Sequence, residues 1–173
     1  MTNVFTSAFS DFFCNFGGGG STLGLVLMMT FMAKSKRLKT LGRMALPAGI
    51  FGINEPIIFG FPMVLNVIMV IPFILAPVMN TIIGQLATAV GFIPVTSGVQ
   101  LSWTTPIFIS GYLTTGSINA VFLQLLMLLA DMALYYPFFK MQDSKYLEEE
   151  EKLAKEEKKD EIDELSFDDL KLD

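Results

Sequence analysis

The apolar stretch that best fits a single membrane span lies at residues 119–139, before a strongly polar C-terminal region. A helix of about 20 residues crosses the hydrocarbon core of a bilayer, so a stretch of this length predicts a transmembrane helix. Ser117 is suited to cap its start, and Tyr135 and Tyr136 stand near its end, where an aromatic belt is expected.

Two further apolar stretches are less regular. Residues 62–93 contain Pro72 and Pro77, which predicts either one long, kinked helix or two short helices joined near Asn80. Residues 23–33 follow a run of four glycines and are only about half the length of a membrane span. This pattern predicts a discontinuous span that starts after a cap at Ser21 or Thr22.

Residues 44–61 and 94–118 are apolar but interrupted by several prolines and glycines each. Irregular backbone is tolerated at membrane depth only where protein buries it or where it lines a wet cavity. We therefore expect two re-entrant hairpins. The two stretches also share a local pattern, because each places two polar residues before Pro-Ile, in the sequences NEPI and TTPI.

The hydropathy pattern inverts after Gln142. Glu148 with Lys152, and Glu151 with Lys155, stand four positions apart in the order that stabilises an exposed helix. We predict two parts: a membrane body over residues 1–143 and an acidic cytoplasmic tail over residues 144–173, helical or disordered, without an apolar face that packs on the body.

Charge distribution supports this division. Apolar residues make up 52% of the 173-residue chain, and residues 44–139 carry only two charged side chains, Glu55 and Asp131. A soluble domain carries charge on roughly a quarter of its residues, so the body is predicted to be an all-α integral membrane protein in the lipid bilayer. By the positive-inside rule, the basic segment 34–43 is a cytoplasmic loop.

Several classes of function are excluded by composition. The chain has no histidine and one cysteine, which argues against a zinc site, a histidine-based triad or an internal disulfide. The short basic cluster is explained by membrane topology, so we expect no nucleic acid partner. No catalytic residue, metal or cofactor is predicted.

Three residues in the interrupted stretches point to chemistry. A carboxylate inside a membrane is unfavourable unless it faces a polar cavity or partner, so Glu55 is interpreted as functional, with capping of its own hairpin as the alternative. Trp103 adjoins Thr104 and Thr105. An aromatic ring beside hydroxyl groups suits a sugar, and an interfacial belt tryptophan is the alternative. For Asp131, a functional role and a helix-packing role remain equally open.

The sequences LGRMALPAGIFGINEPIIFGFPMVLNVIMVIPFILAPVMN, SWTTPIFISGYLTTG and LYYPFFKMQD occur in this order. Together they resemble the C-terminal half of the membrane permease subunit, enzyme IIC, of the lactose/cellobiose/diacetylchitobiose family in the bacterial phosphotransferase system. The resemblance runs from about Thr6 to Asp143 and implies a transport domain of transmembrane helices with two re-entrant hairpins.

The resemblance also implies a function. The chain is expected to bind and translocate a β-disaccharide, of the cellobiose type, for phosphorylation by a separate enzyme IIB, and the glutamate at position 55 to hydrogen-bond sugar hydroxyls. The expected partners are the sugar, enzyme IIB, a missing N-terminal half and a second permease copy in a homodimer. The expected location is the bacterial inner membrane, crossed several times. The residues assigned to sugar binding are Asn54, Glu55, Trp103, Thr104 and Thr105.

The family permease is more than twice the length of this chain. A different class of function is therefore kept as the alternative: a non-transporting membrane anchor or interaction protein, or an inactive remnant of a permease.

Overall fold

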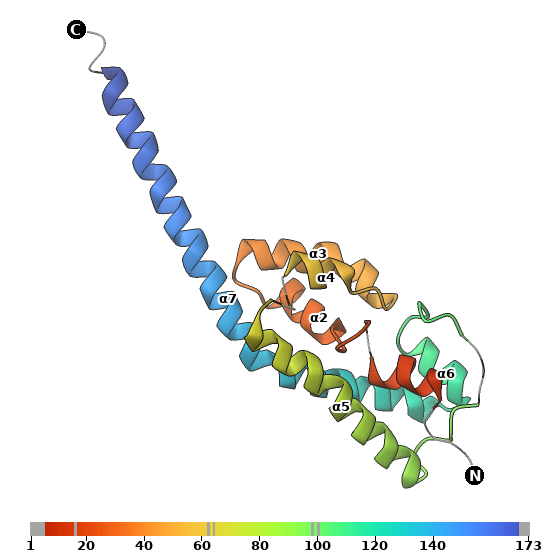
Figure 1. Ribbon diagram of the computed structural model, residues 1–173. Helices are drawn as coiled ribbons and strands as arrows, with labels where there is room; N and C mark the ends of the chain where they lie inside the picture. The colour runs from red at the N-terminus through yellow and green to blue at the C-terminus, as the bar shows by residue number, and fades with distance from the viewer. Residues whose placement is uncertain are drawn as a thin grey trace.

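Helices and the connections between them make up the architecture, and the longest connection runs between α5 and α6 (Figure 1). The computed structural model describes residues 6–15, 17–61, 63, 65–97, 99 and 101–169, with side chains described as far as residue 159, and this described part contains no strand. The elements are α1 (Ser7–Phe9), the π-helical η1 (Ser10–Cys14), α2 (Leu23–Phe31), α3 (Lys36–Ile50), α4 (Glu55–Gly60), α5 (Val67–Ala89), α6 (Ile109–Thr115) and α7 (Ile118–Asp169).

Helices α5 and α7 are both long and apolar enough to cross a membrane, and they pack against each other (Figure 1). Helix α5 continues through Pro72 and Pro77, so the single-helix prediction is confirmed and the junction near Asn80 is wrong. Helix α7 includes the predicted span 119–139 but continues to Asp169.

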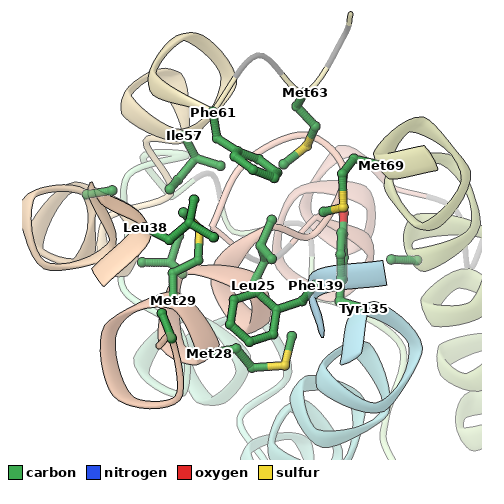
Figure 2. Close-up of a cluster of buried hydrophobic side chains, with 14 residues drawn as sticks. Leu25, Met28, Met29, Leu38, Ile57, Phe61, Met63, Met69, Tyr135 and Phe139 are labelled. Carbon is green, nitrogen blue, oxygen red and sulfur yellow. The ribbon is translucent and has the colours of Figure 1, made fainter. Parts of the chain in front are cut away.

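A compact group formed by α2, α3 and α4 packs against the middle of α7 (Figure 1). Its core contains Leu25 and Met29 of α2, Leu38 of α3 and Ile57 of α4, all fully buried or nearly so. Figure 2 shows that these side chains meet Tyr135, which α7 contributes to the same cluster. Unbranched methionine side chains adapt to the irregular space between short, crossing helices, which explains why several of them belong to this cluster.

The first interrupted stretch forms a helical hairpin, since α3 and α4 are joined by a short turn over residues 51–54. Its first helix begins at Lys36, so the expected basic loop 34–43 is mostly helix. The insertion of this hairpin into a membrane stays a prediction.

The second interrupted stretch does not form two helices of its own. Residues 94–97, 99 and 101–108 lack helix, and only α6 follows them before α7 begins. Prolines at 94 and 106 have no N–H to donate, and side chains replace part of the helical bonding, as where the Ser97 hydroxyl donates to the Thr114 carbonyl at 2.8 Å. The predicted start at Pro62 and the breaker Gly98 lie outside the described residues.

The predicted helix caps have different outcomes. At the start of α7, the Asn119 N–H donates to the Ser117 hydroxyl at 3.3 Å, which confirms that cap. Neither predicted cap of α2 forms, because Thr22 donates to the Gly17 carbonyl at 2.9 Å and Ser21 donates to Asp131. The Ser21 and Thr22 hydroxyls instead hold the segment around the glycine run, through these bonds to Asp131 and Gly17.

The tail begins as a packed helix rather than a free one. Asp143 and Glu150 bond to the start of α3, and the ring of Tyr146 lies 5.8 Å from that of Phe61. The expectation of a tail that does not pack on the body is therefore wrong for its first two turns. The division at residue 143 stays a prediction, and residues 170–173 of the tail lie outside the described part.

Candidate functional site

A cavity of about 340 Å³ lies between the glycine run, the turn of the α3–α4 hairpin and the loop before α6. Asn54, Glu55 and Trp103 line it, so the structure brings together three of the five residues that the sequence singles out. The other residues in its wall are Asp11, Asn15, Gly18, Gly19 and Gly52.

Asn54 holds the hairpin turn against the glycine run. Its side-chain amide donates to the Gly19 carbonyl at 2.7 Å. Gly18 has a φ of +96°, and a Cβ atom there would lie 2.6 Å from the Asn54 side chain. Both the backbone conformation and the close approach therefore require glycine at position 18.

Glu55 stands in the first turn of α4, directly before Pro56. Its side chain is exposed, and no donor in the described part of the chain bonds to its carboxylate. An acidic group is favoured at a helix N-terminus by the helix dipole. No hydrogen bond supports the hairpin-capping alternative, and the carboxylate is free to accept hydrogen bonds from a ligand.

The loop before α6 carries the other predicted residues. Trp103 is 60% exposed and forms part of the cavity wall. Thr105 lines a small adjoining pocket that also includes Asp11, Asn15 and Trp103. The Thr104 hydroxyl instead pairs with that of Ser102 at 2.8 Å, and Thr104 lines neither pocket.

Gln124 fixes this loop from the second turn of α7. Its fully buried side chain accepts from the Phe108 N–H at 2.8 Å and donates to the Phe12 carbonyl at 2.8 Å. A Cβ atom on Gly111 would lie 2.4 Å from the Gln124 oxygen, so the glycine allows α6 to approach closely. Sequence analysis missed this role, although Gln124 is the only glutamine in the apolar stretch 119–139.

A second buried polar cluster supports the glycine run. Asp131 is fully buried and accepts hydrogen bonds from Ser21 and from the Asn80 amide, the latter at 2.9 and 3.1 Å. Tyr135 donates to the Gly20 carbonyl at 2.6 Å. Asp131 thus packs helices together and does not line the cavity, which favours its structural interpretation.

Asp11 and Asn15 were not assigned to the site from the sequence, yet both line the two adjoining pockets. Asp11 is the only charged residue before Lys34, which is the signal that identifies it. With Glu55 it gives the cavity two carboxylates. Such a wall offers several hydrogen-bond acceptors beside one aromatic ring, which suits a neutral polyhydroxylated ligand.

Comparison with known proteins relates the chain to sugar permeases. The family model described as "Phosphotransferase system, EIIC" matches residues 1–77. The cellobiose-specific EIIC component of Geobacillus stearothermophilus is 47% identical over 152 residues, which cover 87% of this chain and 34% of that protein. The lichenan permease IIC component of Bacillus subtilis (strain 168) is 39% identical over 154 residues, which cover 88% of this chain and 34% of that protein.

The fold has a solved counterpart. The crystal structure of the transporter ChbC, the IIC component from the N,N'-diacetylchitobiose-specific phosphotransferase system, matches with a TM-score of 0.84 and 43% identity. The match covers 86% of this chain and 35% of that structure. This chain therefore spans about a third of the length of the proteins it resembles.

Proposed function

We propose that this chain, which belongs to the EIIC family of the phosphotransferase system, contributes the sugar-binding portion of a membrane permease. Its ligand is a β-disaccharide of the cellobiose type, which the permease carries inward for phosphorylation by a separate enzyme IIB. The observation that carries the proposal is the cavity in which Asn54, Glu55 and Trp103 meet, although the tryptophan is far from the other two in the sequence.

The chemistry of the cavity suits a sugar. The carboxylates of Glu55 and Asp11 accept hydrogen bonds from hydroxyl groups, and the Asn15 amide is able to donate as well as accept. Trp103 offers a flat apolar surface on which the C–H face of a pyranose ring packs. Hydroxyl recognition and ring packing together distinguish a sugar from a purely polar or purely apolar solute.

The charge of the cavity favours release of a phosphorylated product. Among the residues that line it, Asp11 and Glu55 are negative and none is positive. A neutral sugar encounters no repulsion there, whereas both carboxylates repel the negative phosphate of a sugar phosphate. Phosphorylation thus weakens binding of the sugar that has just been carried.

The choice of a cellobiose-type sugar rests on the relatives. One is a cellobiose-specific component and another a lichenan permease. Cellobiose is a β-linked pair of glucose units, so we infer a preference for β-glucosides with two pyranose rings whose hydroxyl groups are equatorial.

The remainder of the permease is proposed to come from another polypeptide segment. Exposed apolar side chains cover one face of α5 and of α7, as at Ile74, Leu86 and Phe122. Lipid or neighbouring membrane helices cover such faces in a multi-pass protein of the bacterial inner membrane. We infer a partner N-terminal half, a homodimer of the completed permease, and a membrane-inserted α3–α4 hairpin.

The test is uptake of radiolabelled cellobiose by cells with an intact phosphotransferase chain that express this chain with a matching N-terminal half. Uptake should require both halves and should fall strongly in Glu55→Gln. Glu149→Gln, which removes an exposed carboxylate outside the cavity, is the matched control and should transport normally. Equal uptake by Glu55→Gln at equal membrane expression would refute the assignment of the site.

A further inference from the structure

A second cavity, of about 480 Å³, lies far from the sugar site, where α3, α4 and α7 meet near the start of the tail. Leu41, Met44 and Gly60 form its apolar side, and the ring of Tyr146 contributes to its wall. None of these residues lines the sugar cavity.

The polar side of this cavity is cationic. Lys36 and Arg37 line it together with the Thr40 hydroxyl. Among the residues that the structure describes, neither cation forms a salt bridge. The Glu150 carboxylate lies near Lys36, but its hydrogen bonds go to the backbone N–H groups of Lys36 and Arg37, at 3.1 and 2.8 Å.

Arg37 is also held in a defined position. Its guanidinium carbon lies 5.1 Å from the centre of the Tyr146 ring. This cation–π contact leaves the guanidinium N–H groups available for an anion, while it restricts the side chain to the mouth of the cavity.

The position of the cavity along α7 matches the lipid headgroup layer. The apolar part of α7 ends at Phe139 and the first basic residue follows at Lys140. Tyr146 lies seven residues beyond Phe139, which corresponds to about 10 Å of helix. A cationic mouth at this level attracts the phosphate of an anionic phospholipid, and the apolar wall beside it suits the acyl chain.

We propose that this cavity binds an anionic phospholipid. The phosphate lies between Lys36 and Arg37, and the first part of an acyl chain lies along Leu41 and Met44. The size of the cavity falls within the range of small-molecule sites. A free phosphate would use only the cationic mouth, and the 65% exposed Met44 below it indicates an apolar occupant.

The test is native mass spectrometry of the full chain in mild detergent with added dioleoyl-phosphatidylglycerol, compared with dioleoyl-phosphatidylcholine. The wild type should retain phosphatidylglycerol, and Lys36→Gln/Arg37→Gln should reduce its affinity by about tenfold or more. Lys158→Gln/Lys159→Gln removes the same charge from the exposed tail and should change nothing. Equal losses in both double variants, or equal retention of both lipids, would overturn the proposal.

A second variant separates the lipid from a free anion. Met44→Asp places a carboxylate on an exposed part of the apolar wall, so it should weaken phosphatidylglycerol binding with the cationic mouth intact. Millimolar inorganic phosphate should not displace the lipid. Displacement by phosphate together with unchanged binding in Met44→Asp would identify an anion site and contradict the lipid. No sugar is present in either measurement, so the result is independent of the transport proposal.

Discussion

Ser35 and Glu150, 115 positions apart in the sequence, are joined by a hydrogen bond of 2.7 Å between the serine hydroxyl and the glutamate carboxylate. The same carboxylate accepts from the N–H groups of Lys36 and Arg37, and Asp143 accepts from those of Lys34 and Ser35. The first N–H groups of a helix have no partner within it. Two carboxylates of α7 thus cap α3 and connect α7 to the α3–α4 hairpin, which carries Glu55.

This cap should be sensitive to acid. The Ser35 hydrogen bond, followed by the backbone donors, lowers the pKa of Glu150 below its ordinary value. A lowered pKa means that the cap stabilises the fold above the ordinary glutamate pKa of about 4.3 and is lost as pH falls through the lower folded value. Hydrogen exchange at the Lys36 and Arg37 amides should therefore accelerate, relative to their intrinsic rates, in that pH interval.

Glu150→Gln provides the comparison for the acid experiment. The glutamine keeps the shape of the side chain but does not titrate, so protection of the two amides should be lower at neutral pH and nearly independent of pH. A wild-type pH dependence that persists in Glu150→Gln would assign the effect to another group.

Replacing Glu55 by glutamine should weaken β-disaccharide binding by about tenfold or more. The amide keeps the size of the side chain but exchanges one acceptor oxygen for a donor and removes the charge that strengthens hydrogen bonds. Equilibrium binding to the reassembled permease, normalised to folded protein, measures the loss. Lower expression with unchanged affinity would favour a structural role for Glu55.

Substitutions of Trp103 should follow the area of the ring. Trp103→Phe keeps an apolar ring and should lose less affinity than Trp103→Ala, which removes the packing surface altogether. The 60% exposed side chain makes few internal contacts, so neither variant should unfold the chain. Isothermal titration with cellobiose gives the order, and equal affinities in all three proteins would indicate an interfacial tryptophan.

Gly18→Ala should damage the sugar site through Asn54. The new Cβ atom would lie 2.6 Å from the Asn54 side chain, in a backbone conformation that alanine rarely adopts. Gly91→Ala is the matched control, since Gly91 also has a positive φ, +75°, but has no neighbour within 4 Å of an added Cβ. Binding should fall in the first variant and stay unchanged in the second.

Truncation of the tail should have an effect that depends on its position. A chain that ends at Leu153 retains Tyr146 and Glu150 and should bind sugar like the full chain. A chain that ends at Lys145 loses both contacts with the hairpin and should bind more weakly. Side-by-side binding curves test this, and full affinity in the shorter chain would show that the cap is dispensable.

The sequence predicts the continuous features of the fold well. Apolar length identifies α5 and the inner part of α7, and the position of Ser117 identifies a cap, because these signals are local. The glycines and prolines of residues 44–61 also predict a hairpin, and α3 and α4 form a helical hairpin that begins earlier, at Lys36, whereas its re-entry into a membrane stays a prediction.

What the sequence leaves undetermined depends on contacts between distant segments. Residue type does not show that Asp131 faces Asn80, that Gln124 holds the loop before α6, or that Asp11 shares a cavity with Glu55. The hairpin expected in the second interrupted stretch does not form two helices, for a related reason. Thr114 there accepts from the backbone N–H of Ser97, 17 positions earlier in the same stretch, so bonding between the two ends of the stretch takes the place of bonding along a helix.

Helix α7 is unbroken from the membrane region to Asp169, and beyond Glu150 it continues for about 28 Å. Its last fixed contact with α3, in the part of the chain that the structure describes, is the cap, about which the free part of the helix would pivot. A tilt of about 10° at the cap would displace the far end of the helix by about 5 Å, simply from the length of the rod. Rocking of the α3–α4 hairpin about this cap would thereby be enlarged into a displacement at the charged end of the chain.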